Sequence, residues 1–482
     1  MSKPVQIGNQ GPVVATSAMT IDGHSVKADR TFEVVNPATA RRVADAPECA
    51  PSQVDDVMEA AVRAFASWKV DDDARRRALR AGADELDAAA HELAVTLTAE
   101  HGKPLRDSLR EVATAATWFR WYADLDLGEP EIVEDSAARR IAVYRRPLGP
   151  AVAITPWNYP IQMAGKKAAQ ALRPGNTVVV KPSPYTPLAT LKFVEILQRV
   201  FPPGVLSAVT GSSNDLGRWL TEHPLTRKVS FTGSTGVGKL VAASAVPDLK
   251  RVTLELGGND AAIVLDDAAP ELIAKEIFAR AFVNCGQTCA AIKRLYVPEQ
   301  LHELVVDALA EYARAAVVGN GMESDTELGP LNNHPQQQLV SELVDDALRN
   351  GARAAAGGRR PDTEGYFYRP TILTDVDDGM RIVNEEQFGP ALPVLSYRHL
   401  DDAIERANNS NYGLGGSVWT SDPDRGAEIA RRLDCGTAWV NTHAITLPHQ
   451  PFAGAKWSGM GVENGRWGLH DFTQLQAIHT AR

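Results

Sequence analysis

The stretch RKVSFTGSTGVG, residues 227–238, contains the transition on which the fold assignment depends. Its first part, RKVSFTGS (227–234), is a short run with β-branched residues, which is typical of a buried strand. Its glycines then permit a close backbone approach, and a helix is expected over 236–245. A helix that begins directly after a strand presents its N-terminus to a phosphate group. The pattern is neither G-x-G-x-x-G nor a GK[ST] loop, so a plain tight turn is an equally good interpretation of this stretch alone.

The same alternation of strand and helix extends outward on both sides of this stretch. Such spacing predicts a parallel sheet with helices on its faces. A second set of strands follows, so the sequence predicts two α/β domains in series that join near residues 255–260. The first set has strands at 151–155, 176–182 and 205–211 and helices at 162–172, 187–200 and 213–222; the second has strands at 261–265, 293–297 and 437–441.

Two further segments flank the predicted domains. Helices are expected over 52–68, with Ser52 as N-cap, and over 74–126. Residues 129–146 are polar and predict an extended hairpin, and the tail 471–482 is strand-like. Both are expected to be able to pair with the sheet edge of another subunit.

Overall composition excludes several classes of protein. The 482 residues are 44% hydrophobic and 23% charged, as in a globular chain, and the net charge of −10 argues against nucleic acid as a partner. No apolar run is long enough for a membrane span, and the N-terminus lacks the apolar core of a signal peptide. The 4 cysteines form no disulfide framework, which favours a cytoplasmic location.

Three short motifs carry candidate chemistry. VNCGQTCAA (283–291) holds Cys285 and Cys289, which taken alone fit a nucleophile, two buried structural thiols or a weak metal site. ELGGND (255–260) places the carboxylate of Glu255 at a strand end, although a surface glutamate would look the same. TPWNYP (155–160) offers the Asn158 amide as an oxyanion donor or as an ordinary turn residue.

The order of the motifs resembles the aldehyde dehydrogenase superfamily over nearly the whole chain. The resemblance implies the aldehyde dehydrogenase-like α/β fold, with two parallel-sheet domains and a β-hairpin oligomerisation element. It assigns 1–126 and 147–254 to an NAD(P)-binding domain, 255–467 to a catalytic domain, and 127–146 with 468–482 to oligomerisation. The motifs are NPATA (36–40), EHGKPL (100–105), TPWNYP (155–160), KPSP (181–184), FTGST (231–235), ELGGN (255–259), N-x-G-Q-x-C (284–289), EEQFGP (385–390) and PFAGAKWSG (451–459).

The resemblance implies a covalent mechanism. Cys289, the last residue of N-x-G-Q-x-C, is the expected nucleophile, and Asn158 with the Cys289 backbone N–H is expected to hold the oxyanion. Glu255 is the expected general base that hydrolyses the thioester, and Lys167 matches a proton-relay lysine. Cys285 is an expected bystander, with a protective disulfide to Cys289 under oxidation as the alternative.

The same resemblance implies a nicotinamide cofactor and no metal. Lys181 is expected at the adenosine ribose, Ser234 at the pyrophosphate, Glu386 and Gln336 at the nicotinamide ribose and Phe388 beside the ring. The cofactor site is also expected to include Thr155, Pro156, Trp157, Ser183, Pro184, Gly217, Phe231, Gly233, Leu256 and Gly257.

This chain departs from the family pattern at three positions. Pro184 stands where the family often has a glutamate that accepts both ribose hydroxyls, so NADP is an expected alternative to NAD. Ala453 replaces a glycine, and Val462 stands where an arginine is common.

The expected substrate pocket is mixed in character. It comprises Tyr159, Met163, Thr288, Ala290, Phe452 and the loop 442–450 with His443 and His449. Because this set contains no arginine or lysine, a neutral aromatic or medium aliphatic aldehyde is expected and a semialdehyde is disfavoured.

Two rival functions remain open. The first is a CoA-acylating dehydrogenase, which needs no water-activating carboxylate, and the second is a catalytically silent binding protein on the same scaffold. The expected partners are the aldehyde and a second copy of the chain in a homodimer or homotetramer.

Overall fold

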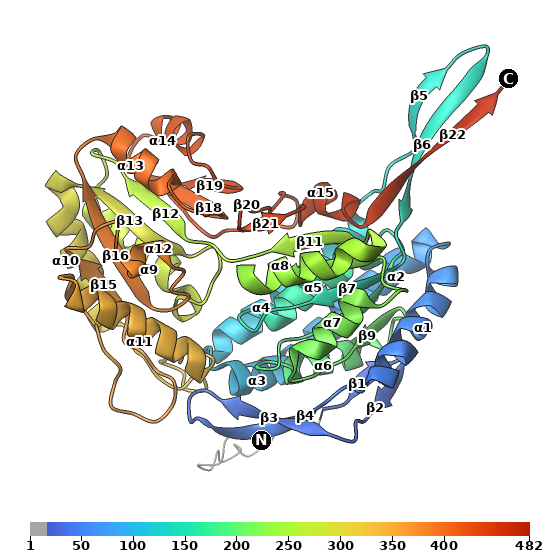
Figure 1. Ribbon diagram of the computed structural model, residues 1–482, viewed down its shortest axis with the longest axis horizontal. Helices are drawn as coiled ribbons and strands as arrows, with labels where there is room; N and C mark the ends of the chain where they lie inside the picture. The colour runs from blue at the N-terminus through green and yellow to red at the C-terminus, as the bar shows by residue number, and fades with distance from the viewer. Residues whose placement is uncertain (1–16) are drawn as a thin grey trace, which may run out of the picture.

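The computed structural model describes residues 17–482, so the part of the predicted first domain that spans 1–16 lies outside the described residues. Figure 1 shows two lobes, each with its own sheet and covering helices, and a narrow three-stranded sheet that extends away from them. The predicted α/β fold with two sheets in series is confirmed.

The first sheet contains the strand of the opening motif near its centre. Its middle strands run parallel and are buried on both faces, which explains their continuous Val, Ile and Ala composition. The strands in order across the sheet are β2 (His24–Val26), β1 (Met19–Ile21), β9 (Leu206–Ala208), β8 (Thr177–Lys181), β7 (Pro150–Ile154), β10 (Lys228–Thr232), β11 (Arg251–Glu255) and β21 (Gly459–Met460). The helices between them are α5 (Pro160–Leu172), α6 (Leu188–Leu197), α7 (Asn214–Glu222) and α8 (Thr235–Ala245).

Four N-terminal helices belong to this lobe: the first packs on the strands of the sheet, and the other three pack on the helices that cover it. The predicted helix over 74–126 is divided into three helices. Ala89 separates the first from the second, and the Gly102–Pro104 turn separates the second from the third. The predicted N-cap Ser52 is wrong: Ala50 is the N-cap, and Pro51 occupies the first helical position, which its fixed φ suits. The helices are α1 (Pro51–Trp68), α2 (Asp72–Ala88), α3 (Ala90–His101) and α4 (Leu105–Asp124); a small hairpin, β3 (Thr31–Asn36) with β4 (Arg41–Pro47), precedes them.

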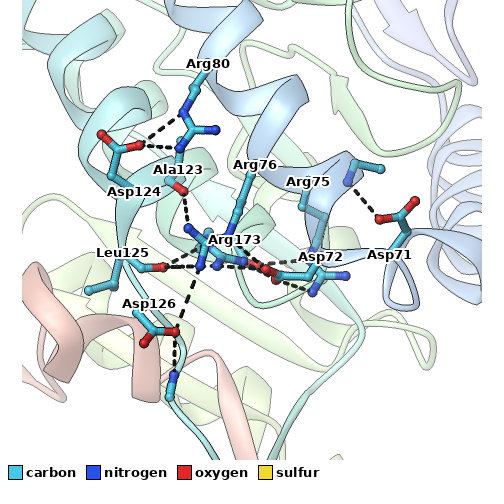
Figure 2. A network of polar contacts seen from close by, with 12 residues as sticks. Asp71, Asp72, Arg75, Arg76, Arg80, Ala123, Asp124, Leu125, Asp126 and Arg173 are labelled. Carbon is cyan, nitrogen blue, oxygen red and sulfur yellow. Dashed lines mark hydrogen bonds and ion pairs between the residues drawn. The ribbon is translucent and has the colours of Figure 1, made fainter.

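A buried ion-pair network ties these helices to the end of α5 (Figure 2). Asp72 at the start of α2 accepts hydrogen bonds from Arg75 at 2.8 Å, from Arg76 at 2.9 Å and from the fully buried Arg173. Partial burial would raise the pKa of Asp72, but the bonds from Arg173 and Arg76 lower it to about 2. Arg173 also donates to the Leu125 carbonyl oxygen at 3.0 Å, so the network joins the ends of α4 and α5.

The second sheet has seven strands, of which the three predicted ones are present. The others escaped prediction because they are short or contain Pro393, Gly415 and Gly416. In order the strands are β14 (Arg353–Ala356), β15 (Thr371–Thr374), β16 (Ala391–Tyr397), β13 (Ile292–Pro298), β12 (Asp260–Val264), β18 (Gly415–Trp419) and β19 (Thr437–Val440). Its helices are α9 (Pro270–Phe282), α10 (Glu299–Ala315), α11 (His334–Arg349), α12 (Arg381–Asn384), α13 (Leu400–Asn408) and α14 (Pro423–Ala430).

The C-terminal segment returns to the first lobe. A two-stranded ladder, β17 (Tyr412–Gly413) with β20 (Ala455–Lys456), leads to β21, which pairs antiparallel with β11, and then to α15 (Gly465–His470). The tail forms β22 (Thr473–Ala481), which pairs along its whole length with β6 (Arg139–Pro147), and β6 pairs with β5 (Glu131–Asp135). The predicted hairpin and strand-like tail are therefore confirmed, and they pair with each other within one chain (Figure 1).

Candidate functional site

A cavity of about 630 Å³ lies where the loops after β7, β8, β10 and β11 meet the loop after α9. It brings together residues that are far apart in the sequence. All but one of the predicted cofactor residues line it: Thr155, Pro156, Trp157, Lys181, Ser183, Pro184, Phe231, Gly233, Ser234, Leu256, Gly257, Gln336, Glu386 and Phe388. Of the predicted substrate residues, His443 and His449 do not line it, whereas these do: Tyr159, Met163, Thr288, Ala290 and Phe452.

The Cys289 loop owes its shape to a run of left-handed residues. Asn284, Cys285 and Gly286 have φ values of 53°, 59° and 73°. A Cβ on Gly286 would lie 2.2 Å from the Gly389 carbonyl oxygen, so only glycine fits there. This turn exposes Cys289 to the cavity and leaves Cys285 buried, with both thiols free. Burial raises the pKa of the Cys289 thiol to about 12.

Lys293 holds the same loop from the side of the second sheet. Its ammonium donates to the Thr288 carbonyl oxygen at 2.6 Å and to that of Cys289 at 2.8 Å. Its positive charge opposes the effect of burial on the Cys289 pKa. Within the described part of the chain, no three His, Cys, Asp or Glu side chains cluster in a way that would hold a metal ion.

Asn158 lies in the turn between β7 and α5, and its side chain is fixed at both ends. Its amide nitrogen donates to the Gln287 carbonyl oxygen at 2.9 Å, and its amide oxygen accepts from the Tyr159 backbone N–H at 3.1 Å. The amide nitrogen thus points toward the Cys289 loop with one further hydrogen to offer.

A buried ion pair that sequence reasoning missed supports this turn. Lys103 donates to the Asn158 carbonyl oxygen at 2.7 Å and pairs with Glu111 at 2.5 Å. Glu111 also accepts the backbone N–H groups of Ile161 and Gln162, so it satisfies the first turn of α5. No local pattern connects the two residues, because Lys103 lies in the turn before α4 and Glu111 lies within that helix.

Glu255 ends β11 and is buried behind the cavity. One carboxylate oxygen has no hydrogen-bond partner among the described residues. Burial raises the pKa of Glu255 well above its usual value, and the negative charge of Glu463 raises it further, whereas Lys166 and Lys167 oppose the shift. The raised pKa makes the Glu255 carboxylate a stronger proton acceptor than a solvated glutamate.

Glu463 forms the centre of a buried cluster with the two adjacent lysines of α5. One of its oxygens pairs with Lys166 and the other with Lys167, and Lys167 also donates to the Ser230 hydroxyl at 2.9 Å. Burial would raise the pKa of Glu463, but the two ammonium groups lower it to about 2. Glu463 and Lys166 were not predicted, because 296 residues separate Glu463 from Lys167 and no local pattern connects them.

The cofactor end of the cavity fits a dinucleotide. Lys181 is buried and donates only to the Pro182 carbonyl oxygen at 3.2 Å, and burial lowers its pKa to about 8. Ser234 caps α8 by accepting the Val237 N–H, and a Cβ on Gly236 would meet no atom within 4 Å, so space is open before the helix N-terminus. The hydroxyls of Thr155 and Thr232 are buried and have no hydrogen-bond partner within residues 17–482.

Glu386 and Gln336 form the other part of this end. Glu386 accepts the Gly258 N–H at 3.0 Å, and a Cβ on Gly257 would lie 2.3 Å from its second oxygen. The Gln336 amide donates to the carbonyl oxygens of Gln387 and Phe388 at 2.8 and 3.2 Å, so it fixes the loop that carries Phe388. Gly217 does not line the cavity; it lies behind Lys181, and a Cβ there would be 4.0 Å from the lysine Cε.

The substrate end differs from the prediction in two ways. His443 is wrong as a pocket residue, because it is fully buried against Trp439, with its Nε2 3.4 Å from Asp260. Ala444 and Thr446 of the same loop line the cavity instead. Lys166 and Arg280 also line it, so the premise that no cation reaches the pocket is wrong.

Comparison with known proteins identifies the family. The family model described as "Aldehyde dehydrogenase family" matches residues 25–478. The chain is 38% identical to 3-sulfolactaldehyde dehydrogenase of Pseudomonas putida over 95% of this chain and 96% of that protein.

Solved structures agree with this match. The NAD+ complex of a Bacillus cereus aldehyde dehydrogenase superposes with a TM-score of 0.94 at 35% identity, covering 97% of each chain. A structure described as an E. coli NADP-dependent enzyme gives a TM-score of 0.95 at 33% identity, covering 97% of this chain and 98% of that one. The chain therefore belongs to the aldehyde dehydrogenase family and is an enzyme that oxidises aldehydes to carboxylic acids with NAD or NADP as acceptor.

Proposed function

We propose that this enzyme works through a covalent thioester on Cys289 that Glu255 releases by hydrolysis. The observation that carries the proposal is the arrangement around Cys289. Its thiol lines the cavity, the Asn158 amide points toward the same loop, and the Glu255 carboxyl group with its raised pKa lies behind it.

The first chemical step is attack of the Cys289 thiolate on the aldehyde carbon, which forms a C–S bond and turns the carbonyl oxygen into an oxyanion. The Asn158 amide and the Cys289 backbone N–H stabilise that oxyanion. The nicotinamide cofactor, when bound, supplies the hydride acceptor that makes the reaction an oxidation.

The second step is hydrolysis of the thioester. Glu255 takes a proton from water, the resulting hydroxide attacks the acyl carbon, and the C–S bond breaks to return the Cys289 thiolate. The Glu463, Lys166 and Lys167 cluster sets the charge around Glu255, and we assign Lys167 a role in carrying the proton away. A CoA-acylating enzyme would need no such base, so the buried Glu255 favours water as the acceptor.

For the cofactor we assign Lys181 to the adenosine ribose, the N-terminus of α8 with Ser234 to the pyrophosphate, and Glu386 to the nicotinamide ribose. Pro184 supplies no carboxylate to the ribose hydroxyls. We infer that NADP supports turnover alongside NAD.

The names of the relatives also bear on the charge of the substrate. The Pseudomonas putida relative is named for an aldehyde that carries a sulfonate. A relative from Pseudomonas fluorescens, 37% identical, is named for phenylacetaldehyde, so the relatives are compatible both with a negatively charged aldehyde and with the neutral aromatic aldehyde that the sequence favoured.

We also propose that the enzyme associates with further copies of its own chain and that it is located in the cytoplasm. The sheet of β5, β6 and β22 exposes five large apolar side chains, which belong to Ile132, Val133, Tyr144, Leu475 and Ile478. Exposed apolar side chains on an uncovered sheet favour association with a second copy of the chain. Four free thiols favour a reducing, cytoplasmic location. Across residues 17–482, no helix combines the length and apolarity needed to cross a lipid bilayer.

Replacement of the nucleophile tests the proposal. Cys289→Ala should lower the rate of reduced-cofactor formation by at least about a thousandfold, because no other thiol lines the cavity among the described residues. Cofactor affinity, measured by fluorescence titration, should stay within about twofold, since this substitution removes no proposed cofactor contact.

The matched control is Cys285→Ala, which should retain most activity because that thiol is buried outside the cavity. Loss of activity in Cys285→Ala with retention in Cys289→Ala would overturn the assignment. A requirement for CoA in product formation would replace hydrolysis with acyl transfer.

A further inference from the structure

Ionisable side chains are unevenly distributed along the cavity that holds Cys289. At the cofactor end, Lys181 is accompanied by the carboxylate of Glu386. At the substrate end, Lys166 and Arg280 line the wall, and no aspartate or glutamate among the described residues lines the cavity there. The substrate end is therefore cationic, whereas the cofactor end has both signs.

Lys166 is the deeper of these two cations. It lies one helical turn after Met163 on α5, and its Nζ is 5.8 Å from the centre of the Phe452 ring. Lys166 is only 4% exposed, so water screens its charge poorly.

Its carboxylate partner, Glu463, is shared. One oxygen of Glu463 pairs with Lys166 and the other with Lys167, so a single carboxylate faces two ammonium groups. Lys166 is the member of this cluster that lies on the cavity wall.

Arg280 lies nearer the solvent, in the last turn of α9. Its side chain is 32% exposed and touches Glu276 through one nitrogen at 3.3 Å. Its Nε is buried and has no hydrogen-bond partner among the described residues. A guanidinium with free donors matches the two oxygens of a carboxylate or sulfonate.

We propose that the preferred substrate is an aldehyde that carries an anionic group, a carboxylate or a sulfonate, at the end away from the reacting carbon. This inference rests on the proposed attack by Cys289 and adds the chemical class of the substrate. Tyr159, Met163 and Phe452 provide apolar walls for the connecting carbons. An anion at the distal end would pair with Lys166, whose carboxylate partner is shared with Lys167, and with Arg280, whose Nε has no partner among the described residues.

The test compares matched substrates. Wild-type enzyme should use a short aldehyde with a terminal carboxylate at least about tenfold better in kcat/KM than the methyl ester of the same aldehyde, mostly through KM. A short aldehyde with a terminal sulfonate, assayed in parallel, distinguishes the two anions: whichever is preferred identifies the group that the cations recognise.

Two variants connect the preference to its residues. Lys166→Met and Arg280→Gln should each be measured as the ratio of kcat/KM for the charged over the uncharged substrate, and that ratio should fall at least about fivefold in one or both. Lys166→Arg keeps the positive charge and should retain most of the wild-type ratio. Lys275→Gln removes an exposed lysine from the same helix as Arg280 and should leave the ratio unchanged, since Lys275 does not line the cavity.

The results that would contradict the substrate class differ from those that would contradict the Cys289 mechanism. A wild-type ratio near one, or a ratio that neither Lys166→Met nor Arg280→Gln lowers, would overturn the substrate class while leaving aldehyde oxidation intact. Loss of both activities together would instead count against the Cys289 mechanism, and if Lys166→Met fails to fold, the wild-type ratio and Arg280→Gln still decide.

Discussion

At the scale of single residues, the site depends on how burial and charge shift proton affinities. Burial raises the pKa of both Cys289 and Glu255, so each group is protonated more readily than it would be in water. The mechanism needs both groups deprotonated, the first as nucleophile and the second as base. The rate should therefore rise with pH until both groups are deprotonated, and it should fall as the pH is lowered.

The charge of Glu463 gives a specific form of this prediction. Glu463 raises the pKa of Glu255, while Lys166 and Lys167 lower it. Glu463→Gln removes the raising charge and leaves the lowering ones, so the acid limb of the deacylation rate should move to lower pH. Single-turnover kinetics across pH measure this, with thermal melts to check folding and the exposed Glu385→Gln as control. A shift to higher pH would contradict the assignment.

At the scale of elements, function lies in the loops that follow parallel strands. Strand β8 ends at Lys181, the loop after it contains Pro184, and the loop after β10 leads into the N-terminus of α8. Glu48 lies close enough to raise the pKa of Lys181, but it accepts the Ser212 N–H and does not line the cavity. No acidic side chain among the described lining residues therefore faces a ribose 2′-phosphate beside Pro184.

Pro184→Glu tests this element. A carboxylate at that position would accept the ribose hydroxyls of NAD and repel the 2′-phosphate of NADP. The ratio of kcat/KM for NAD over NADP should rise by about tenfold to a hundredfold, because a hydrogen bond to a charged group is worth about 1.5–3 kcal/mol. The exposed Tyr185→Phe is a neighbouring control. An unchanged ratio in Pro184→Glu would mean that the ribose binds elsewhere.

Much of this arrangement is predictable from the sequence because the signals are local. Continuous apolar runs identify β7, β8 and β10, and the motif order identifies Cys289, Asn158 and Glu255. The strands β15, β16 and β18 are short or interrupted by proline and glycine, so no run marks them. Lys166, Arg280 and Glu463 escape for another reason: their role depends on segments that meet only after folding, which is also why His443 was misplaced.

At the scale of the whole molecule, residues from both lobes line the cavity, and the three-stranded sheet of β5, β6 and β22 extends away from the two lobes (Figure 1). We predict that the native enzyme is a dimer or a dimer of dimers, so light scattering should give at least about twice the 52.0 kDa of one chain. Val133→Glu with Leu475→Glu places charges at two exposed apolar positions of that sheet and should shift the mass toward 52.0 kDa.

Leu272→Glu is the control for this shift, because Leu272 is exposed on α9, away from that sheet. A wild-type mass of 52.0 kDa at micromolar concentration would contradict the predicted assembly.

The central claim is that a thioester forms on Cys289 and that Glu255 removes it. Glu255→Gln keeps the shape of the side chain but cannot accept a proton from water. Acylation of Cys289 should therefore continue while hydrolysis of the thioester is blocked. Mixed with NAD and an aldehyde, this variant should give a burst of NADH of about one equivalent per site, followed by a stalled steady state. Mass spectrometry of the quenched, digested protein should then show the acyl group on the peptide at Cys289. An acyl group on Cys285, or no acyl adduct at all, would contradict the account.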